Sequence, residues 1–246
     1  MPRTQKALRG WRKLAPARSR VPRALALWMA VCAQLCRRGE HQMAVFVVLS
    51  VECYLRPSEA LRLRKKDLIT PSAFTNCWGL VVNAEEIGQQ SKTFEFDDSL
   101  MIDSEWVQFL KPILTVMKEG DPLAPVFTFR YTRFVEELAL ACEQLQCPRM
   151  VPYEMRHSGP SHDRMVKSRS LLEVQKRGRW KTTRSLVRYE KHTRMLQAWS
   201  RLPAAVRAHA ERCQKAVGEF MLGRREAPPP LLQTGTGAAK TATSRS

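Results

Sequence analysis

Apolar residues recur at helical spacing over most of the chain. From Arg23 to Leu49 they follow a period of three to four residues, and Arg37-Arg38-Gly39 interrupts them, which predicts two helices. Pro57 and Glu59 are typical of a helix start, and we expect this helix to end before Pro71. The same spacing predicts further helices at 104–118, 132–145, 161–176, 181–200 and 203–222.

The pattern changes between the third and fourth predicted helices. Trp78-Gly79-Leu80-Val81-Val82 and Thr93-Phe94-Glu95-Phe96 are typical of two strands, joined by a loop that ends at Lys92. The fold class predicted is therefore mostly α with a small antiparallel β-sheet. We expect one domain at 23–222, preceded by a basic disordered or partly helical arm at 1–22 and followed by a disordered tail at 223–246, where prolines, glycines and small residues dominate.

Charge narrows the choice of partner. The chain has 246 residues and a formal net charge of +18. Residues 1–25 hold eight basic and no acidic residues, 74–147 hold five basic and twelve acidic, and 149–201 hold fourteen basic and four acidic. Any single basic run could be a solvated helix face, but separate blocks of opposite sign favour an oriented surface that faces phosphates. No apolar run approaches the ~18 residues that span a bilayer. Nucleic acid is favoured over a membrane surface because the charge accompanies residues suited to phosphate chemistry and not an amphipathic anchor.

The cysteines do not indicate a disulfide framework or a metal site. Their number, seven, is odd, and no secretory segment precedes them, so we expect a reducing compartment and buried thiols. The close pairs Cys32/Cys36 and Cys142/Cys147 lack zinc-ligand spacing. No metal and no cofactor are predicted.

Two arginines stand where an anion could bind. Arg56 follows an apolar run and precedes a helix start, and Glu59 three residues later can pair with it and fix its rotamer. Arg156 lies beside Tyr153 and His157 in Tyr153-Glu154-Met155-Arg156-His157. Taken alone, the first pattern could be a capping ion pair and the second a structural polar cluster.

Downstream, Gly178-Arg179-Trp180 precedes Tyr189, which follows Trp180 by nine residues and lies among cations. Positive charge favours a phenolate and places it close to any bound phosphate, although an ordinary amphipathic tyrosine is the commoner case.

Together these features resemble the tyrosine recombinase (phage integrase) catalytic domain. The family's boxes read here, in order, Arg56-Pro57-Ser58-Glu59, Lys92 in a turn, Tyr153-Glu154-Met155-Arg156-His157, Trp180 and Tyr189. The resemblance covers about residues 23–200. The Gly-Arg-Trp form is most similar to the recombinases of DIRS-like and Crypton-like mobile elements.

The resemblance implies a mechanism without metal or ATP. Tyr189 would attack a DNA phosphodiester and form a 3′-phosphotyrosyl link, while Lys92 protonates the leaving 5′-oxygen. Arg56 and Arg156 would hold the non-bridging oxygens, because guanidinium is planar, bidentate and always charged.

The remaining residues of the pattern would have smaller roles. Trp180 would donate its indole N–H to the phosphate or form a wall of the pocket, Glu59 would support Arg56, and His157 would have a supporting role. Tyr153 replaces the histidine usual at its position, and its reference pKa near ~10 makes it a poorer base. The family also usually has a separate helical domain before the catalytic one, where this sequence has only the arm 1–22, so we expect weak site recognition by this chain alone.

The resulting hypothesis is strand cleavage and rejoining of double-stranded DNA, in site-specific recombination or integration. Its alternatives are type IB topoisomerase-like relaxation, a catalytically inactive DNA-binding remnant, and a basic RNA-binding protein, which no aromatic sheet motif supports. The predicted C-terminal helix at 203–222 could mediate self-association on DNA or pack on its own domain. A nuclear location is expected if the source is eukaryotic, and a cytoplasmic one, on DNA, otherwise.

Overall fold

The computed structural model describes residues 20–82, 98–182, 186 and 191–232, together with residues 4, 5 and 7. The element order is α2 (Leu25–Arg37), α3 (His41–Glu52), α4 (Pro57–Arg62), η1 (Lys65–Asp67), β1 (Leu68–Ile69), β2 (Trp78–Val82), β3 (Asp98–Ile102), η3 (Glu105–Val107), α5 (Leu110–Lys118), α6 (Tyr131–Gln144), η4 (Pro152–Glu154), α7 (Met155–Met165), α8 (Leu171–Arg177), α10 (His192–Ser200) and α11 (Ala204–Met221). Helices dominate and one small sheet accompanies them, which confirms the predicted fold class.

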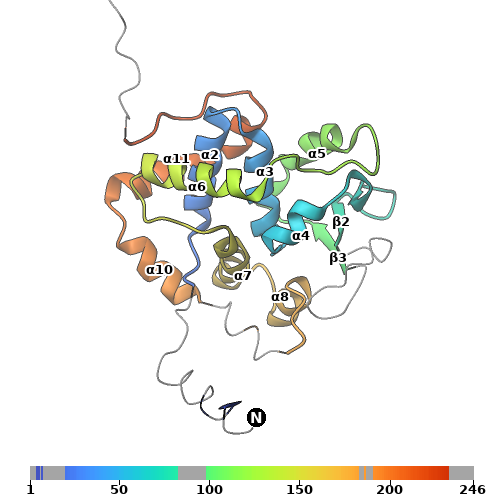
Figure 1. Ribbon diagram of the computed structural model, residues 1–246, viewed down its shortest axis with the longest axis horizontal. Helices are drawn as coiled ribbons and strands as arrows, with labels where there is room; N and C mark the ends of the chain where they lie inside the picture. The colour runs from blue at the N-terminus through green and yellow to red at the C-terminus, as the bar shows by residue number, and fades with distance from the viewer. Residues whose placement is uncertain are drawn as a thin grey trace, which may run out of the picture.

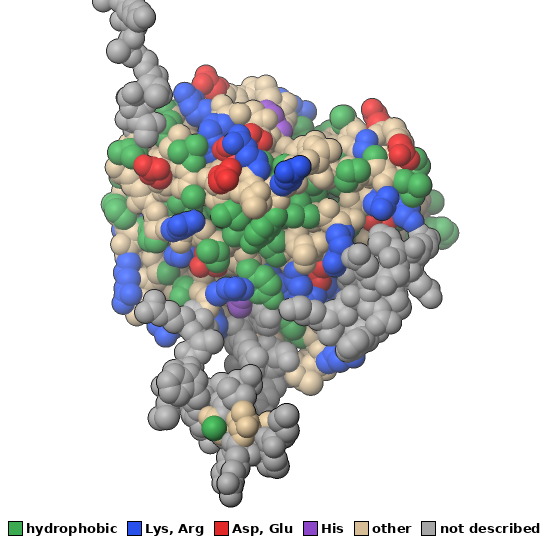
Figure 2. Space-filling view, in the orientation of Figure 1, with side chains coloured by type: hydrophobic (Ala, Val, Ile, Leu, Met, Phe, Trp, Pro, Cys, Tyr) green, Lys and Arg blue, Asp and Glu red, His purple; other side chains and the backbone are tan. Residues whose placement is uncertain are grey.

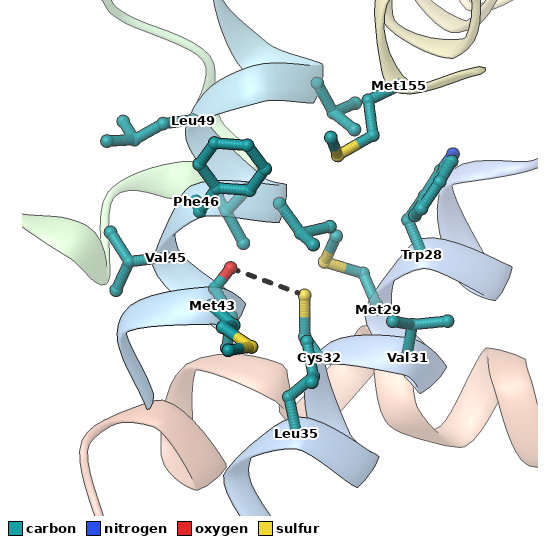
Figure 3. Packing of buried hydrophobic residues seen from close by; sticks show 14 of the residues in the cluster. Trp28, Met29, Val31, Cys32, Leu35, Met43, Val45, Phe46, Leu49 and Met155 are labelled. Carbon is teal, nitrogen blue, oxygen red and sulfur yellow. Dashed lines mark hydrogen bonds between the residues drawn. The ribbon is translucent and has the colours of Figure 1, made fainter. Parts of the chain in front are cut away.

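The core forms around α2, which is apolar on almost every side. All of its residues from Leu25 to Cys36 are buried, because α3, α6, α7 and α11 surround it (Figure 1). Figure 3 shows the contact between α2 and α3, where the thiol of Cys32 points to α3 and donates to the carbonyl oxygen of Ala44 at 3.6 Å. The indole of Trp28 donates to Ser158 Oγ at 2.9 Å and so connects α2 to α7.

The C-terminal helix is part of this core. The apolar face of α11, including Val206, Cys213 and Phe220, is buried, and α11 packs chiefly against α2 of the same chain. This is the self-packing arrangement that the sequence left open, and self-association stays a prediction. The chain then runs back over α2 and α6: Ala227 is buried, and Leu232 donates its backbone N–H to the Gln144 carbonyl at 3.0 Å.

The sheet has three antiparallel strands in the order β1-β2-β3. Strand β2 has the bounds that the sequence predicts, and Val82 at its end pairs with Asp98 at the start of β3. The predicted strand at 93–96 lies outside the described residues, as does Lys92. The two-residue strand β1 was not predicted, because it is too short to show an alternating pattern.

Three helix predictions differ from the structure in their bounds. The segment 104–118 is divided into η3 and α5, and 161–176 is divided between α7, which begins earlier at Met155, and α8. At the second division Lys167 has a φ of 57°, and Ser170 caps α8 by accepting from Glu173 N, so polar residues end one helix and begin the next. Of the predicted helix at 181–200, the described part forms α10 from His192 onward.

The cysteines are mostly inside the molecule. Five of the seven thiols are buried and those of Cys77 and Cys147 are half-buried, which confirms the expected burial for most of them. Among the described residues, no helix has the length and apolarity needed to cross a bilayer.

Candidate active site

Arg56 and Glu59 form an ion pair at the start of α4. Arg56 has extended backbone dihedrals and Pro57 begins the helix, so the Glu59 carboxylate turns back to accept from the Arg56 backbone N–H at 2.7 Å. The same carboxylate accepts from Arg56 Nη1 through its other oxygen. The Arg56 side chain is 14% exposed, whereas that of Glu59 is 2% exposed. The pairing expected from their spacing is therefore present, with Arg56 on the solvent side.

Arg156 lies beneath this pair, in the first turn of α7, and no part of it is exposed. Its guanidinium donates to two backbone carbonyls, through Nη1 to Tyr54 and through Nη2 to Gly178 at 2.6 Å. Nη1 is also 3.8 Å from Glu59 Oε2. Arg56 and Arg156, a hundred residues apart in sequence, thus share one carboxylate.

A third arginine completes the group, and sequence reasoning missed it. Arg179 donates through Nη2 to Glu59 Oε2 at 2.7 Å, and its side chain is 3% exposed. From the sequence alone, Arg179 is only the middle residue of Gly178-Arg179-Trp180. The sequence carries no signal for this contact, because the left-handed residue that reverses the chain after α8 is Arg179 itself, with a φ of 55°, whereas Gly178 before it has a φ of −79°.

Trp180 packs beside Arg156 and Tyr54. Its ring stacks on Tyr54, with centroids 6.3 Å apart, and the Arg156 guanidinium lies 5.2 Å from the Trp180 ring centroid. A Cβ on Gly178 would overlap the Trp180 ring, and one on Gly159 would overlap the ring of Tyr54 and the carbonyl of Val51. Glycine at both positions therefore allows these rings to pack closely.

Tyr153 and His157 lie on the other side of Arg56. The Tyr153 ring is 5.6 Å from that of His157, and the Arg20 guanidinium lies 4.4 Å from the Tyr153 ring centroid. Burial acts to lower the pKa of Arg56, but the charge and hydrogen bond of Glu59, followed by those of Tyr153, outweigh it and raise that pKa. Tyr153 therefore interacts with the same guanidinium as Glu59 does.

The charges of this group do not balance. Among the described residues, three guanidiniums, those of Arg56, Arg156 and Arg179, lie around the carboxylate of Glu59, and Asp98 Oδ2 lies 3.7 Å from Arg179 Nε. Burial, together with repulsion from Arg179 and Arg56, lowers the pKa of Arg156 to about 10. A bound anion would relieve this repulsion. We call these four residues the cation-rich cluster.

A second arginine group lies near the Tyr54 hydroxyl, and in it each arginine has a carboxylate partner within 3 Å. Arg177 donates to Glu52 Oε1 at 2.6 Å, and Arg169 pairs with Asp103 at 2.6 Å and with Asp163 at 2.9 Å. Two cations thus face three carboxylates. We call these five residues the balanced cluster; the Tyr54 hydroxyl joins it by donating to Asp163.

Two of the predicted catalytic residues, Lys92 and Tyr189, lie outside the described residues. Described residues on either side of Tyr189 nevertheless lie near Trp180 and α7. Leu186 is buried in a small apolar cluster with Tyr54, Val174 and Trp180, and the backbone N–H of Lys191 donates to Ser161 Oγ on α7 at 3.1 Å.

The basic block at 149–201 is partly internal. Arg156, Arg177 and Arg179 are buried, so they do not contribute to the surface. On the face shown in Figure 2, Lys and Arg side chains form several separate groups with hydrophobic residues between them. In the part of the chain that the structure describes, no group of three or more His, Cys, Asp or Glu side chains could hold a metal ion.

Two solved structures resemble this fold. Both are of the XerH site-specific recombinase: a pre-cleavage complex with its difH substrate, at a TM-score of 0.51 and 11% identity, and a post-cleavage complex with palindromic difH, at a TM-score of 0.51 and 14% identity. The matches cover 74% and 76% of this chain, but 53% and 55% of the XerH chains, so this chain spans about half their length. No protein-family model and no curated protein sequence matches. The fold is thus similar to that of a tyrosine recombinase catalytic domain, as the motif order implied.

Proposed function

We propose that this chain breaks and rejoins double-stranded DNA through a 3′-phosphotyrosyl intermediate. The observation that carries the proposal is the cation-rich cluster: three arginines around one carboxylate, in a fold similar to XerH. Excess positive charge in a site with little water interacts strongly with the charge that develops on a pentacoordinate phosphate.

In the proposed reaction the phenol oxygen of Tyr189 attacks phosphorus and the P–O5′ bond breaks. Lys92 supplies the proton that the 5′-oxygen takes up, and the phenol proton of Tyr189 passes to water, while the Tyr153 hydroxyl can hydrogen-bond the phosphate. Rejoining reverses these steps, so phosphodiester bonds are conserved and nothing is oxidised or reduced.

In this proposal each described residue of the site has its own role in binding the phosphate. Arg56 is the guanidinium with solvent access, so we assign it the direct contact. Arg156 contributes charge from beneath, fixed by the Tyr54 and Gly178 carbonyls. Trp180 forms one wall, Glu59 orients Arg56, and His157 packs against Tyr153.

The biological setting belongs to the proposal as well. DNA recombination or integration, a mobile-element origin of the DIRS-like or Crypton-like type, a domain at 23–222 and a nuclear location in a eukaryote all follow from the resemblance. Self-association through α11 would use its exposed face, because its apolar face packs on α2.

A covalent-adduct assay tests the proposal. Nicked duplexes of randomised sequence, in which the cleaved strand end diffuses away, should leave protein–DNA adduct on a denaturing gel. Tyr189→Phe should abolish the adduct, whereas Tyr131→Phe, at an exposed tyrosine on α6, should keep it. Equal adduct from the wild type and Tyr189→Phe would show that Tyr189 is not the nucleophile.

The second candidate is a catalytically inactive DNA-binding remnant. Two observations favour it: Tyr153 stands where the family usually has histidine, and Arg156 has no exposed surface. It predicts salt-dependent binding of duplex DNA without adduct from any variant.

A further inference from the structure

Arg179 occupies a backbone position that favours glycine. At the end of α8 the N–H of Trp180 donates to the Gln175 carbonyl at 3.1 Å and the N–H of Arg179 donates to the Lys176 carbonyl at 2.9 Å. This pair of bonds is a Schellman motif, in which the residue at the Arg179 position is left-handed, and its φ is 55°. A residue with a Cβ is strained there, so an arginine needs a compensating interaction.

The guanidinium of Arg179 contacts several protein groups. Besides Glu59, Arg179 contacts the Tyr54 carbonyl through Nη2 at 3.5 Å and the Arg177 carbonyl through Nη1 at 3.2 Å. Nε is 3.7 Å from Asp98, the first residue of β3. With its side chain 3% exposed, Arg179 is placed to act on these protein groups and not on a ligand at the surface.

Glu59 is the group through which Arg179 can act. One carboxylate oxygen, Oε1, accepts from Arg56 Nη1, and the other, Oε2, accepts both from Arg179 Nη2 and from the Arg56 backbone N–H. Without Arg179, Oε2 would lose its side-chain donor and keep the bond from the Arg56 backbone N–H, so the carboxylate would be held less firmly in the orientation that fixes the Arg56 guanidinium.

We infer that Arg179 is a positioning residue, which holds Glu59 so that Arg56 faces the phosphate. The inference rests on the proposed function, because Arg56 is there the direct phosphate contact. Through Asp98, Arg179 also connects the pocket to the strand that follows the segment containing Lys92.

Arg179→Gly separates this role from simple capping of α8. Glycine suits the left-handed backbone, so the variant should fold, whereas a residue that served only as a cap would be improved by the change. Lys167→Gly is the matched control: Lys167 is exposed, follows α7 and has a φ of 57°, but it lies outside the cluster.

The first measurement needs no catalysis. Thermal unfolding is followed in inorganic phosphate and in chloride at equal ionic strength. Phosphate should raise the midpoint of the wild type and of Lys167→Gly, and Arg179→Gly should lose most of that shift. Arg179→Lys should recover part of it, because lysine keeps the charge without the planar guanidinium.

The second measurement is the rate of adduct formation on nicked duplexes. Arg179→Gly should lower it by about 10²-fold, the scale expected for a displaced binding group. In a Glu59→Gln background the same change should have little further effect, since Arg179 acts through Glu59.

The outcomes distinguish the role of Arg179 from the proposed function. If the phosphate shift and the adduct rate lead to different conclusions about Arg179, the adduct rate decides between them. Adduct from the wild type at a rate that Arg179→Gly leaves unchanged would overturn the role of Arg179 and leave the proposed function standing. A wild type that shows neither a phosphate shift nor adduct would overturn both. An additive effect in the Glu59→Gln background would overturn the route through Glu59.

Discussion

Two groups of buried arginines lie near Tyr54, and they differ in how their charge is compensated. In the balanced cluster, Arg169 and Arg177 face three carboxylates, whereas in the cation-rich cluster three arginines face chiefly Glu59. The two groups have neighbouring arginines: Arg177, the last residue of α8, belongs to the balanced cluster, and Arg179, two residues later, belongs to the cation-rich cluster.

The pKa values of the arginines reflect this difference. Burial opposes the charge of Arg169, but the hydrogen bond and charge of Asp103 outweigh it and raise the pKa. In Arg156, burial and the two neighbouring guanidiniums act together and lower the pKa to about 10. Burial of arginine is therefore no sign of function by itself: the balanced cluster is complete as it stands, and the other would be stabilised by an anion.

The largest expected effect is the loss of a balancing cation. Arg177→Met leaves the buried Glu52 with only Arg169, 3.4 Å away, and should lower the free energy of unfolding by about 3–5 kcal/mol. Arg156→Met should lower it less, by about 1–3 kcal/mol, because the lost hydrogen bonds to the Tyr54 and Gly178 carbonyls are partly offset by relieved repulsion. Urea unfolding at neutral pH measures both, and the reverse order would contradict the distinction between the clusters.

Tyr54→Phe tests the balanced cluster alone. The change removes the hydroxyl that donates to Asp163, while the ring can stay stacked on Trp180 and the carbonyl can stay bonded to Arg156. Because Asp163 is buried and charged, we expect a loss of about 1.5–3 kcal/mol in the free energy of unfolding. No measurable loss would mean that Arg169 satisfies Asp163 without the hydroxyl.

The smallest expected effect is on the free energy of unfolding at acid pH. Burial acts to raise the pKa of Glu59 and of Asp103, but the arginines around each outweigh it and lower both values. Each carboxylate therefore adds stability that is complete above its unfolded pKa, near ~4, and is lost as the pH falls below that value.

The acid effect should be larger for Glu59, whose side chain is 2% exposed, than for Asp103, which is 38% exposed and screened by solvent. Unfolding followed between about pH 5 and about pH 2.5 should become less pH-dependent in Glu59→Gln than in Asp103→Asn. An equal change in both variants would show that burial does not separate the two carboxylates.

Most of the helices could be predicted because periodicity is a local property. The bounds of β2 follow from a short continuous apolar run, and the division between α2 and α3 follows from a polar break. Strand β1 could not be found, because a two-residue strand exists only through its pairing with β2. The break between α7 and α8 was missed because the polar residues 167–170 did not outweigh the helical pattern around them.

In the candidate site, too, local contacts could be predicted and contacts between distant segments could not. The pairing of Arg56 with Glu59 is local and could be predicted from a spacing of three residues. The position of Arg156 beneath that pair depends on α3 and α7 packing together, which no spacing shows. Arg179 was missed because its role depends on the left-handed turn after α8, which directs its side chain to Glu59.

By itself the sequence determined the residue types and their order along the chain: the helical periodicity, the strand β2, the charge of +18 and the positions of the arginines. The tertiary structure alone decided which of those charges meet. It buried Arg156, Arg177 and Arg179, balanced Arg177 with Glu52, and placed the other two with Arg56 around Glu59. The physical reason is that electrostatic interaction depends on distance in space and on exclusion of water, and packing sets both.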